Sequence, residues 1–292
     1  MSTVATPMLK RIAIGVDFAE PSRAAAAWVA RSLAPDAELL LVNAVDNAVP
    51  HEMVAFTEPD EERLTAMMQL AEERLSALAL DLPVASVSVR TGSDRPAWVI
   101  GQAAEQWGAD LIVIGPHGSA QPEWKRLGST AERLVRVSPI PVLTVPIPPA
   151  YRPRRILAPV DQVELTPEVL AWASLMAERC GGTVTLLHAM EPGESNSESD
   201  VSGWLRSLAQ ELPEGAAAEP MVEQGASGSV VVKVASRMGA DLIVMGRRGR
   251  GRGLPAVLGS TVSDVLRSNL CPVLVVTDPS DTVLEGWDGV DG

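Results

Sequence analysis

The feature that most constrains this chain is an internal repeat that covers both of its halves. Ala109–Gly115 reads ADLIVIG and Ala240–Gly246 reads ADLIVMG, so six of seven residues are identical. Downstream of each, Gly128–Thr130 and Gly259–Thr261 both read GST. Self-similarity of this kind indicates two copies of one structural unit. At 292 residues the chain is long enough for two domains that each bury a core.

The repeat extends to both ends of each half. Arg11–Asp17 (RIAIGVD) and Arg155–Asp161 (RILAPVD) are apolar runs that each end in an aspartate. Ile140–Val145 (IPVLTV) and Cys271–Val276 (CPVLVV) both look like β-branched closing strands. The offset is 144 residues from Arg11 to Arg155 but 131 residues between the ADLIV segments. The second half therefore lacks part of its second helix and of the loop before it.

Strand and helix patterns alternate through each half. In the first half we predict strands at 11–16, 38–45, 84–90, 110–115 and 141–145, and helices at 21–33, 60–79, 95–107 and 129–137. In the second half we predict strands at 155–160, 183–189, 219–223, 241–246 and 272–276, and helices at 167–180, 200–211, 227–238 and 260–268. The strands are continuous apolar runs, which is typical of a parallel sheet covered on both faces. In the helix at 60–79, Met67 and Met68 have helical spacing and are expected in the core.

A proline-rich segment separates the halves. Residues 146–155 read PIPPAYRPRR, and their four prolines favour a stiff extended linker. We therefore place domain one at 1–150 and domain two at 151–292. The last residues, about 278–292, form an acidic tail for which we expect disorder.

Composition narrows the classes of partner. The 37 acidic and 24 basic residues give a net charge of -13, which opposes general attraction to nucleic acid or anionic lipid. Only two cysteines are present, so neither a disulfide framework nor a metal cluster is indicated. The first residues are too polar for a signal peptide, and no apolar run is long enough to span a membrane. We expect a cytoplasmic protein whose anion sites, if present, are local.

Each half carries a glycine-rich loop between its fourth strand and the following helix. The spacing Gly-x2-Gly-x9-Gly-Ser occurs twice. Glycine lets backbone N–H groups approach an anion, and the start of a helix offers further donors and a positive dipole end. Across the sheet edge, Asp17 and Asp161 end the first strands, where a carboxylate can accept hydrogen bonds from a base or a ribose.

Several simpler or competing interpretations of these features remain. The loops could be plain strand-to-helix connections, and the two aspartates could cap the helices that follow them. A Walker A loop is not expected, because it requires lysine after its last glycine, where Ser129 and Ser260 stand. A dinucleotide-binding fingerprint is not expected either, because it would follow the first strand and these loops follow the fourth. The tract GRRGRGRG resembles disordered RNA-binding segments but lies in register with the repeat. His51, His117 and His188 are interpreted as packing or surface residues, and 193–200 (GESNSESD) as a solvated loop.

With these motifs, the chain resembles the universal stress protein family in its tandem two-domain, ATP-binding form. The resemblance covers about 9–146 and 153–277. It implies two α/β domains of flavodoxin-like or adenine-nucleotide α-hydrolase-like fold, each a five-stranded parallel sheet between helices. It also implies that the loop glycines and hydroxyls hold the phosphates of ATP, ADP or AMP, and that the strand ends face the adenosine. Mg²⁺ would arrive with the phosphates.

The resemblance assigns binding residues to both halves. In the second half they are Pro159, Val160, Asp161, Ala189, Met245, Gly246, Gly249, Gly259, Ser260 and Thr261. In the first half they are Gly15, Val16, Asp17, Ala44, Ile114, Gly115, Gly118, Gly128, Ser129 and Thr130.

The two loops differ between their glycines. The second loop holds arginines that could neutralise a triphosphate, namely Arg247, Arg248, Arg250 and Arg252. In the first loop Pro116 removes a backbone donor, Glu123 adds a negative charge, and Trp124 is bulky. We therefore rank the second site above the first as a nucleotide site.

The expected function is that of a cytoplasmic stress-response protein that binds an adenine nucleotide and regulates an unidentified protein partner according to occupancy. Neither a general base nor a nucleophile is apparent, so we do not expect an enzyme, although slow ATP hydrolysis or autophosphorylation stays open. The alternative is an interaction module that works without nucleotide. The resemblance further implies that the closing strands 141–145 and 272–276 pair, which would make the chain an internal pseudo-dimer. Whether two chains then form a homodimer is left open.

Overall fold

The computed structural model describes residues 7–45, 61–117, 127–146, 148, 151–161, 166–194, 196–212, 218–247 and 258–277. Domain one contains β1 (Arg11–Gly15), α1 (Glu20–Trp28), a π-helical turn η1 (Val29–Leu33), β2 (Glu38–Ala44), α2 (Glu61–Leu80), β3 (Ser86–Gly92), α3 (Pro96–Trp107), β4 (Leu111–Ile114), α4 (Ser129–Val137) and β5 (Val142–Thr144). Domain two contains β6 (Arg155–Pro159), α5 (Thr166–Cys180), β7 (Thr183–Met190), α6 (Glu198–Glu211), β8 (Ala218–Gln224), α7 (Ser227–Met238), β9 (Leu242–Gly246), α8 (Ser260–Ser268) and β10 (Val273–Val276).

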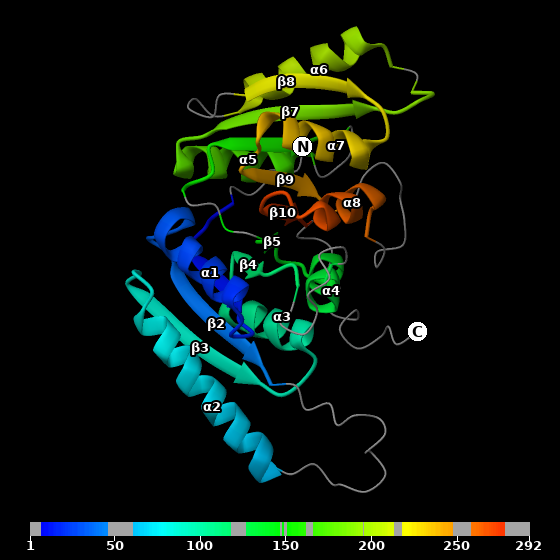
Figure 1. Ribbon diagram of the computed structural model, residues 1–292. Coiled ribbons are helices and arrows are strands. Elements are labelled where there is room, and N and C mark those ends of the chain that lie inside the picture. Colours follow the sequence, from blue (N-terminus) through cyan, green and yellow to red (C-terminus); the bar gives the residue numbers. More distant parts are fainter. Residues whose placement is uncertain are drawn as a thin grey trace, which may run out of the picture.

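All ten strands form one continuous sheet (Figure 1). Its order is β3-β2-β1-β4-β5-β10-β9-β6-β7-β8. Neighbouring strands within each domain are parallel, whereas β5 and β10 pair antiparallel with Leu143 opposite Leu274. The prediction of two α/β domains with five parallel strands each is confirmed, and so is the pairing of the closing strands within the chain.

Helices cover both faces of the sheet. One buried apolar cluster joins the strands to α1, α2, α5 and α6, and a second joins them to α3, α4, α7 and α8. Both clusters contain residues of both domains, so each core runs across the β5–β10 junction. The central strands are buried along their length because helices pack on both faces, as their continuous apolar sequences predict.

Contacts outside the sheet also join the two domains. The guanidinium of Arg179 on α5 pairs with the carboxylate of Asp36, which lies between η1 and β2. The indole N–H of Trp28 donates to the carbonyl of Tyr151 in the linker at 3.3 Å. Within the described part of the chain, no helix is long and apolar enough to cross a membrane.

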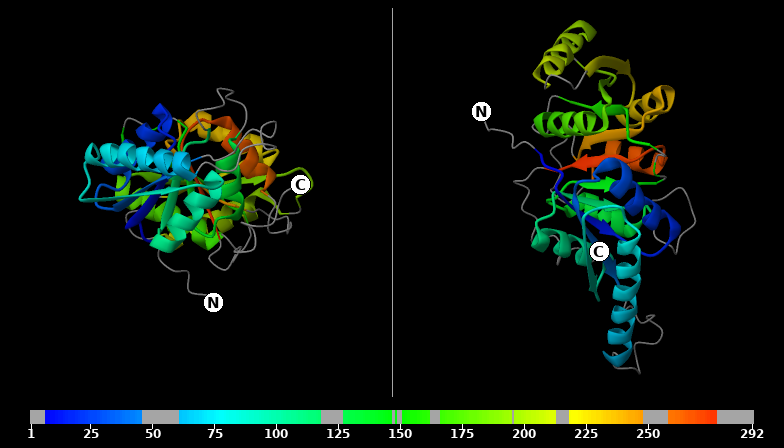
Figure 2. Two further views of the ribbon diagram at one scale, coloured as in Figure 1. Left: turned by 90° about the horizontal axis from the view of Figure 1, so that it is seen from below. Right: turned by 90° about the vertical axis from the view of Figure 1, so that its left-hand side faces the viewer.

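The predicted elements agree closely with the observed ones, with one correction in α2. The predicted bounds of α4, α7 and α8 are reproduced, and the strands shift by at most two residues at either end. Met67 was expected in the core but is 40% exposed, and only Ala71 and Leu75 of α2 are buried. The reason is that the first turns of α2 extend past the strands of the domain (Figures 1 and 2). The apolar face of the helix therefore does not pack against the sheet there.

Candidate functional site

Strand order reverses at one place in each domain. In domain one β1 lies between β2 and β4, and in domain two β6 lies between β7 and β9. We call the carboxyl ends of β1 and β4 the first switch point and those of β6 and β9 the second. Open parallel sheets bind ligands at such points, because the connections leaving the two strands run to opposite faces. The residues predicted at the strand ends lie there, namely Gly15, Val16, Asp17, Ile114 and Gly115 in domain one and Pro159, Val160, Asp161, Met245 and Gly246 in domain two.

The glycine loops lead into helices whose N-cap residues are glycines. α4 follows Gly128 and α8 follows Gly259, and neither cap provides a side-chain hydrogen bond to the first turn. Ser129 and Ser260 are exposed. Backbone N–H groups, hydroxyls and the positive end of the helix dipole therefore meet at each start, which suits an anion.

The backbone brings these helix starts close to the fourth strand of each domain. The N–H of Gly128 donates to the carbonyl of Pro116 at 2.7 Å. A Cβ placed on Gly259 would lie 3.4 Å from the carbonyl oxygen of Arg247. The donors of α4 and α8 thus lie at the switch points. Gly118 and Gly249 lie outside the described residues.

Some predicted binding residues have a packing role of their own. A Cβ on Gly15 would lie 2.7 Å from the terminal methyl of Ile100 on α3, so a larger residue would require this side chain to shift. Ile114 and Met245 are buried, and Ala44 and Ala189 are half-buried at the ends of β2 and β7. Their contact with a nucleotide stays a prediction.

Asp17 shapes the turn that leaves β1. Its carboxylate accepts hydrogen bonds from the N–H of Ala19 at 3.0 Å and from the hydroxyl of Ser22 at 2.6 Å. Phe18 between them has φ 63°, a left-handed conformation that is uncommon for a bulky residue. The guanidinium of Arg74 lies over the Phe18 ring at 3.9 Å. The aspartate therefore stabilises the turn before α1 but does not cap the helix, because the N-cap is Ala19 and no side chain caps it.

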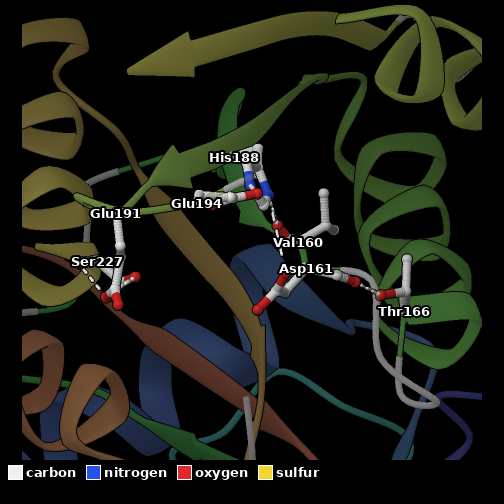
Figure 3. A network of polar contacts seen from close by, with 7 residues as sticks. All are labelled: Val160, Asp161, Thr166, His188, Glu191, Glu194 and Ser227. Atoms are coloured by element: carbon white, nitrogen blue, oxygen red, sulfur yellow. Dashed lines mark hydrogen bonds and ion pairs between the residues drawn. The ribbon is translucent and has the colours of Figure 1, made fainter. Parts of the chain in front are cut away.

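Asp161 occupies the equivalent position in domain two (Figure 3). Its backbone carbonyl accepts a hydrogen bond from the hydroxyl of Thr166 at the start of α5. Its carboxylate lies 4.0 Å from Nδ1 of His188, and the side chain is 28% exposed. Part of the carboxylate therefore faces solvent at the second switch point.

A buried polar pair beside Asp161 was missed by sequence reasoning. His188 on β7 is 2% exposed, and its Nδ1 lies 3.0 Å from the carbonyl oxygen of Val160. Nε2 lies 3.2 Å from Oε1 of Glu194, whose side chain is 5% exposed (Figure 3). Trp204 packs edge-on against the imidazole at 5.7 Å. The interpretation of 193–200 as a solvated loop is wrong at Glu194, because the hydrogen bond to His188 draws this carboxyl inward.

The geometry fixes the position of one proton of this pair. A carbonyl oxygen only accepts, so Nδ1 of His188 carries a proton. The contact between Nε2 and Glu194 then requires one further proton, held either as imidazolium with carboxylate or as imidazole with carboxylic acid. The sequence aligns His188 with Asn43, since each stands one residue before an alanine near the end of the second strand, but it gives no signal for the pairing with Glu194.

Arg247 does not act as predicted. Its side chain is 1% exposed, and Nη1 donates to the carbonyl of Ser138 in domain one at 2.9 Å. The buried guanidinium is held at the C-terminal end of α4 across the domain boundary, so the contacts that the structure shows do not support a direct hydrogen bond from Arg247 to phosphates at the second loop. The remaining arginines of the loop lie outside the described residues, namely Arg248, Arg250 and Arg252.

Known proteins resemble the chain along nearly its whole length. The sequence model of the universal stress protein family matches residues 8–146 and 153–277. A universal stress protein of Thermus aquaticus is 36% identical over 141 residues, which are 47% of this chain and 99% of that protein. Universal stress protein Slr1230 of Synechocystis sp. is 29% identical over 171 residues, 56% of this chain, and the match spans only 57% of that relative's length.

Solved structures share the arrangement of both domains. The crystal structure of a universal stress protein from Archaeoglobus fulgidus DSM 4304 has a TM-score of 0.70 at 18% identity, covering 93% of this chain and 97% of that one. A putative universal stress protein from Pseudomonas aeruginosa has a TM-score of 0.64 at 18% identity, covering 94% and 95%. At these identities the likeness concerns the fold.

Proposed function

This chain belongs to the universal stress protein family, and from that premise we propose that it binds ATP or a related adenine nucleotide at both switch points. The phosphates would bind at the starts of α4 and α8, with the adenosine toward the ends of the first two strands of each domain. Mg²⁺ would be carried by the phosphates, since divalent magnesium is commonly bound through them.

One observation carries this proposal. Gly128 and Gly259 each begin a helix without a side-chain cap, directly beside the carboxyl end of the fourth strand. A helix start at a switch point combines backbone donors, hydroxyl donors and a favourable dipole for a phosphate. Asp17 and Asp161 stand at the other side of the same sheet edges and can accept hydrogen bonds from a ribose.

Nucleotide bound at these sites would change how the protein interacts with a partner, and it would not be consumed in rapid catalytic turnover. We propose a regulatory stress-response protein, acting in the cytoplasm on a protein partner whose identity the site does not specify. Slow hydrolysis would be compatible with this role. The competing proposal, an interaction module without nucleotide, assigns the same loops a purely connecting role.

We still propose that the second nucleotide site binds more tightly than the first, but no longer on the basis of Arg247. With Arg247 directed into domain one, the positive charge available to the second loop comes from the arginines that follow it. Pro116 still removes a backbone donor from the first loop. We expect the second site to bind more tightly.

Mass spectrometry and titration test the proposed function. Ligand released by denaturation of freshly purified protein should contain an adenine nucleotide, and ATP, ADP or AMP should bind the emptied protein saturably. Failure of both would reject nucleotide binding and favour the interaction module. Repeated turnover of a second substrate would instead indicate an enzyme.

Two matched substitutions test the ranking. Ser260→Glu and Ser129→Glu each place a carboxylate where phosphate would bind, and an acidic residue in a first helical turn does not oppose helix formation. Ser260→Glu should weaken ATP binding more. Ser207→Glu, on an exposed position of α6, is the control for added charge. Equal losses from the two site variants would contradict the ranking.

A further inference from the structure

Each helix that begins at one switch point ends against the loop of the other. α4 begins after Gly128, and the carbonyl of its C-cap residue, Ser138, accepts the hydrogen bond from Arg247. α8 begins after Gly259, and the amide nitrogen of its C-cap residue, Asn269, lies 3.0 Å from Nε2 of His117. We call these two connections the α4 arm (α4, Ser138 and Arg247) and the α8 arm (α8, Asn269 and His117). The internal repeat relates them, because Ser138 and Asn269 cap the C-terminal ends of corresponding helices.

The arm through α4 is deeply buried and held twice. Ser138 is completely buried, and its carbonyl receives the charge-assisted hydrogen bond from Nη1 of Arg247 at 2.9 Å. The next carbonyl, that of Pro139, accepts from the hydroxyl of Thr277 at 2.8 Å. Inside the turn, the Ser138 hydroxyl also bonds the backbone of Ile140. Domain two thus donates hydrogen bonds to two successive carbonyls at the end of α4, those of Ser138 and Pro139.

The backbone of Arg247 belongs to the second loop. It directly follows Gly246, and its N–H donates to the carbonyl of Val276 at 2.9 Å. Its own carbonyl lies beside Gly259, the cap of α8. A ligand at α8 therefore acts on the same residue whose side chain holds the end of α4.

The arm through α8 is the weaker one. The Asn269 amide donates to His117, which stands two residues after Gly115 in the first loop. Asn269 ends its helix with φ 50°, a conformation that asparagine tolerates. No formal charge is required in this contact, in contrast to the bond from Arg247.

We propose that these two arms couple the two nucleotide sites, so that nucleotide at one site raises the affinity of the other. This inference rests on the proposed function. A ligand bound at the start of α8 would further stabilise the backbone of Arg247, whose carbonyl lies beside Gly259, and the buried guanidinium would then hold α4 in place for phosphate at its other end. A nine-residue helix is about 13 Å long and transmits such a constraint as a rigid body. The conformational entropy that α4 would lose on binding phosphate is thereby partly lost before the second nucleotide binds.

Coupling of this kind must be reciprocal. If nucleotide at the second site raises affinity at the first by some factor, nucleotide at the first raises affinity at the second by the same factor. Typical factors run from about 5 to 150. We expect a value of about 5 to 20 here, carried mainly by the α4 arm.

Calorimetric titration of the full chain with ATP and Mg²⁺ tests the coupling. Ser260→Glu should lower the affinity of the intact first site about 5-fold or more, and Ser129→Glu should lower the affinity of the intact second site by the same factor. In an Arg247→Met background both factors should fall toward one. Arg206→Met, an exposed arginine on α6, is the matched control and should leave them unchanged.

A second variant keeps the test sharp if Arg247→Met folds poorly. Thr277→Val removes only the hydrogen bond to Pro139 and should reduce the coupling by a smaller factor. Two sites that bind ATP with affinities independent of each other would overturn the coupling alone. A wild-type chain without saturable ATP binding would overturn the proposed function and the coupling with it.

Discussion

The two domains meet the same structural need at the ends of their second strands with different side chains. In domain one, Asn43 donates through Nδ2 to the carbonyl of Val16 at 2.6 Å. In domain two, His188 stands at that position and contacts the carbonyl of Val160 through Nδ1 at 3.0 Å. The fold needs a donor there to hold the backbone beside the aspartate, but an imidazole has a second nitrogen. That nitrogen adds Glu194 to the second switch point.

A second comparison explains the aspartate of the ADLIV motif. Asp110 accepts the backbone N–H groups of Lys10 and Arg11 at 2.8 and 2.9 Å. Asp241 accepts those of Arg154 and Arg155 at 3.1 and 3.0 Å. The motif therefore anchors the first strand of each domain to the fourth. In domain two the side chain of Arg155 also binds this carboxylate, reaching Asp241 at 3.1 Å, whereas in domain one the side chain of Arg11 pairs with Glu38 at 3.5 Å.

The largest expected effect comes from making the second switch point like the first. His188→Asn should keep a donor for Val160 but leave the buried carboxyl of Glu194 without its imidazole, destabilising the protein by about 2–3 kcal/mol. Urea denaturation at neutral pH measures this. The double variant His188→Asn with Glu194→Gln should recover part of the loss. A neutral single variant would show that the pair contributes little.

The next effect contrasts the two anchoring aspartates. Asp241→Ala removes four hydrogen bonds from a largely buried carboxylate and should cost about 2 kcal/mol, whereas Asp110→Ala removes two at a more exposed position and should cost about 1 kcal/mol. Paired denaturation curves give both values. Equal losses would mean that the Arg155 side chain adds nothing.

The pH dependence of that difference follows from the state of Asp241. Burial alone would raise its pKa, but hydrogen bonds from the Arg155 side chain and the backbone of Arg155 and Arg154, with the charge of Arg155, lower the pKa below 3.8. A lowered pKa gives stability that is complete above the unfolded value and is lost as pH falls through the folded one. The stability gap between wild type and Asp241→Asn should therefore narrow below about pH 3.8. A gap that widened on acidification would contradict this sign.

The smallest expected effect concerns the reactivity of the two cysteine thiols, both of which lie in domain two. Burial raises the pKa of Cys180, and burial with the nearby charge of Asp241 raises the pKa of Cys271 to about 12. Neither should react with iodoacetamide in the native protein at pH 8, because the thiolate is the nucleophile. Labelling under increasing urea should then report the opening of domain two alone. Rapid labelling without urea would contradict the burial of both thiols.

Much of the fold could be predicted because its signals are local and repeated. Continuous apolar strands and two aligned copies predict the order of the elements, and the β5–β10 pairing follows from the family resemblance. Met67 was misassigned because helical spacing shows which side chains share a face, and not whether a sheet lies opposite.

For the candidate site, the positions of the strand ends and helix starts were predictable, while nucleotide binding there stays a prediction. The strand ends and the starts of α4 and α8 lie where the glycine spacing indicates. The direction of Arg247 was not predictable, because its partner is a carbonyl 109 residues away across the domain boundary. The pairing of His188 with Glu194 was hidden for a related reason, since a polar loop sequence does not show which carboxyl turns inward.

Binding stoichiometry tests the central claim most directly. ATP with Mg²⁺ should be titrated into nucleotide-free protein and into the Ser129→Glu, Ser260→Glu and double variants, with Ser207→Glu as control. The account predicts two ATP per wild-type or control chain, one per single variant and none for the double variant. Saturable binding that survives in the double variant, or is absent from the wild type, would contradict nucleotide sites at the starts of α4 and α8.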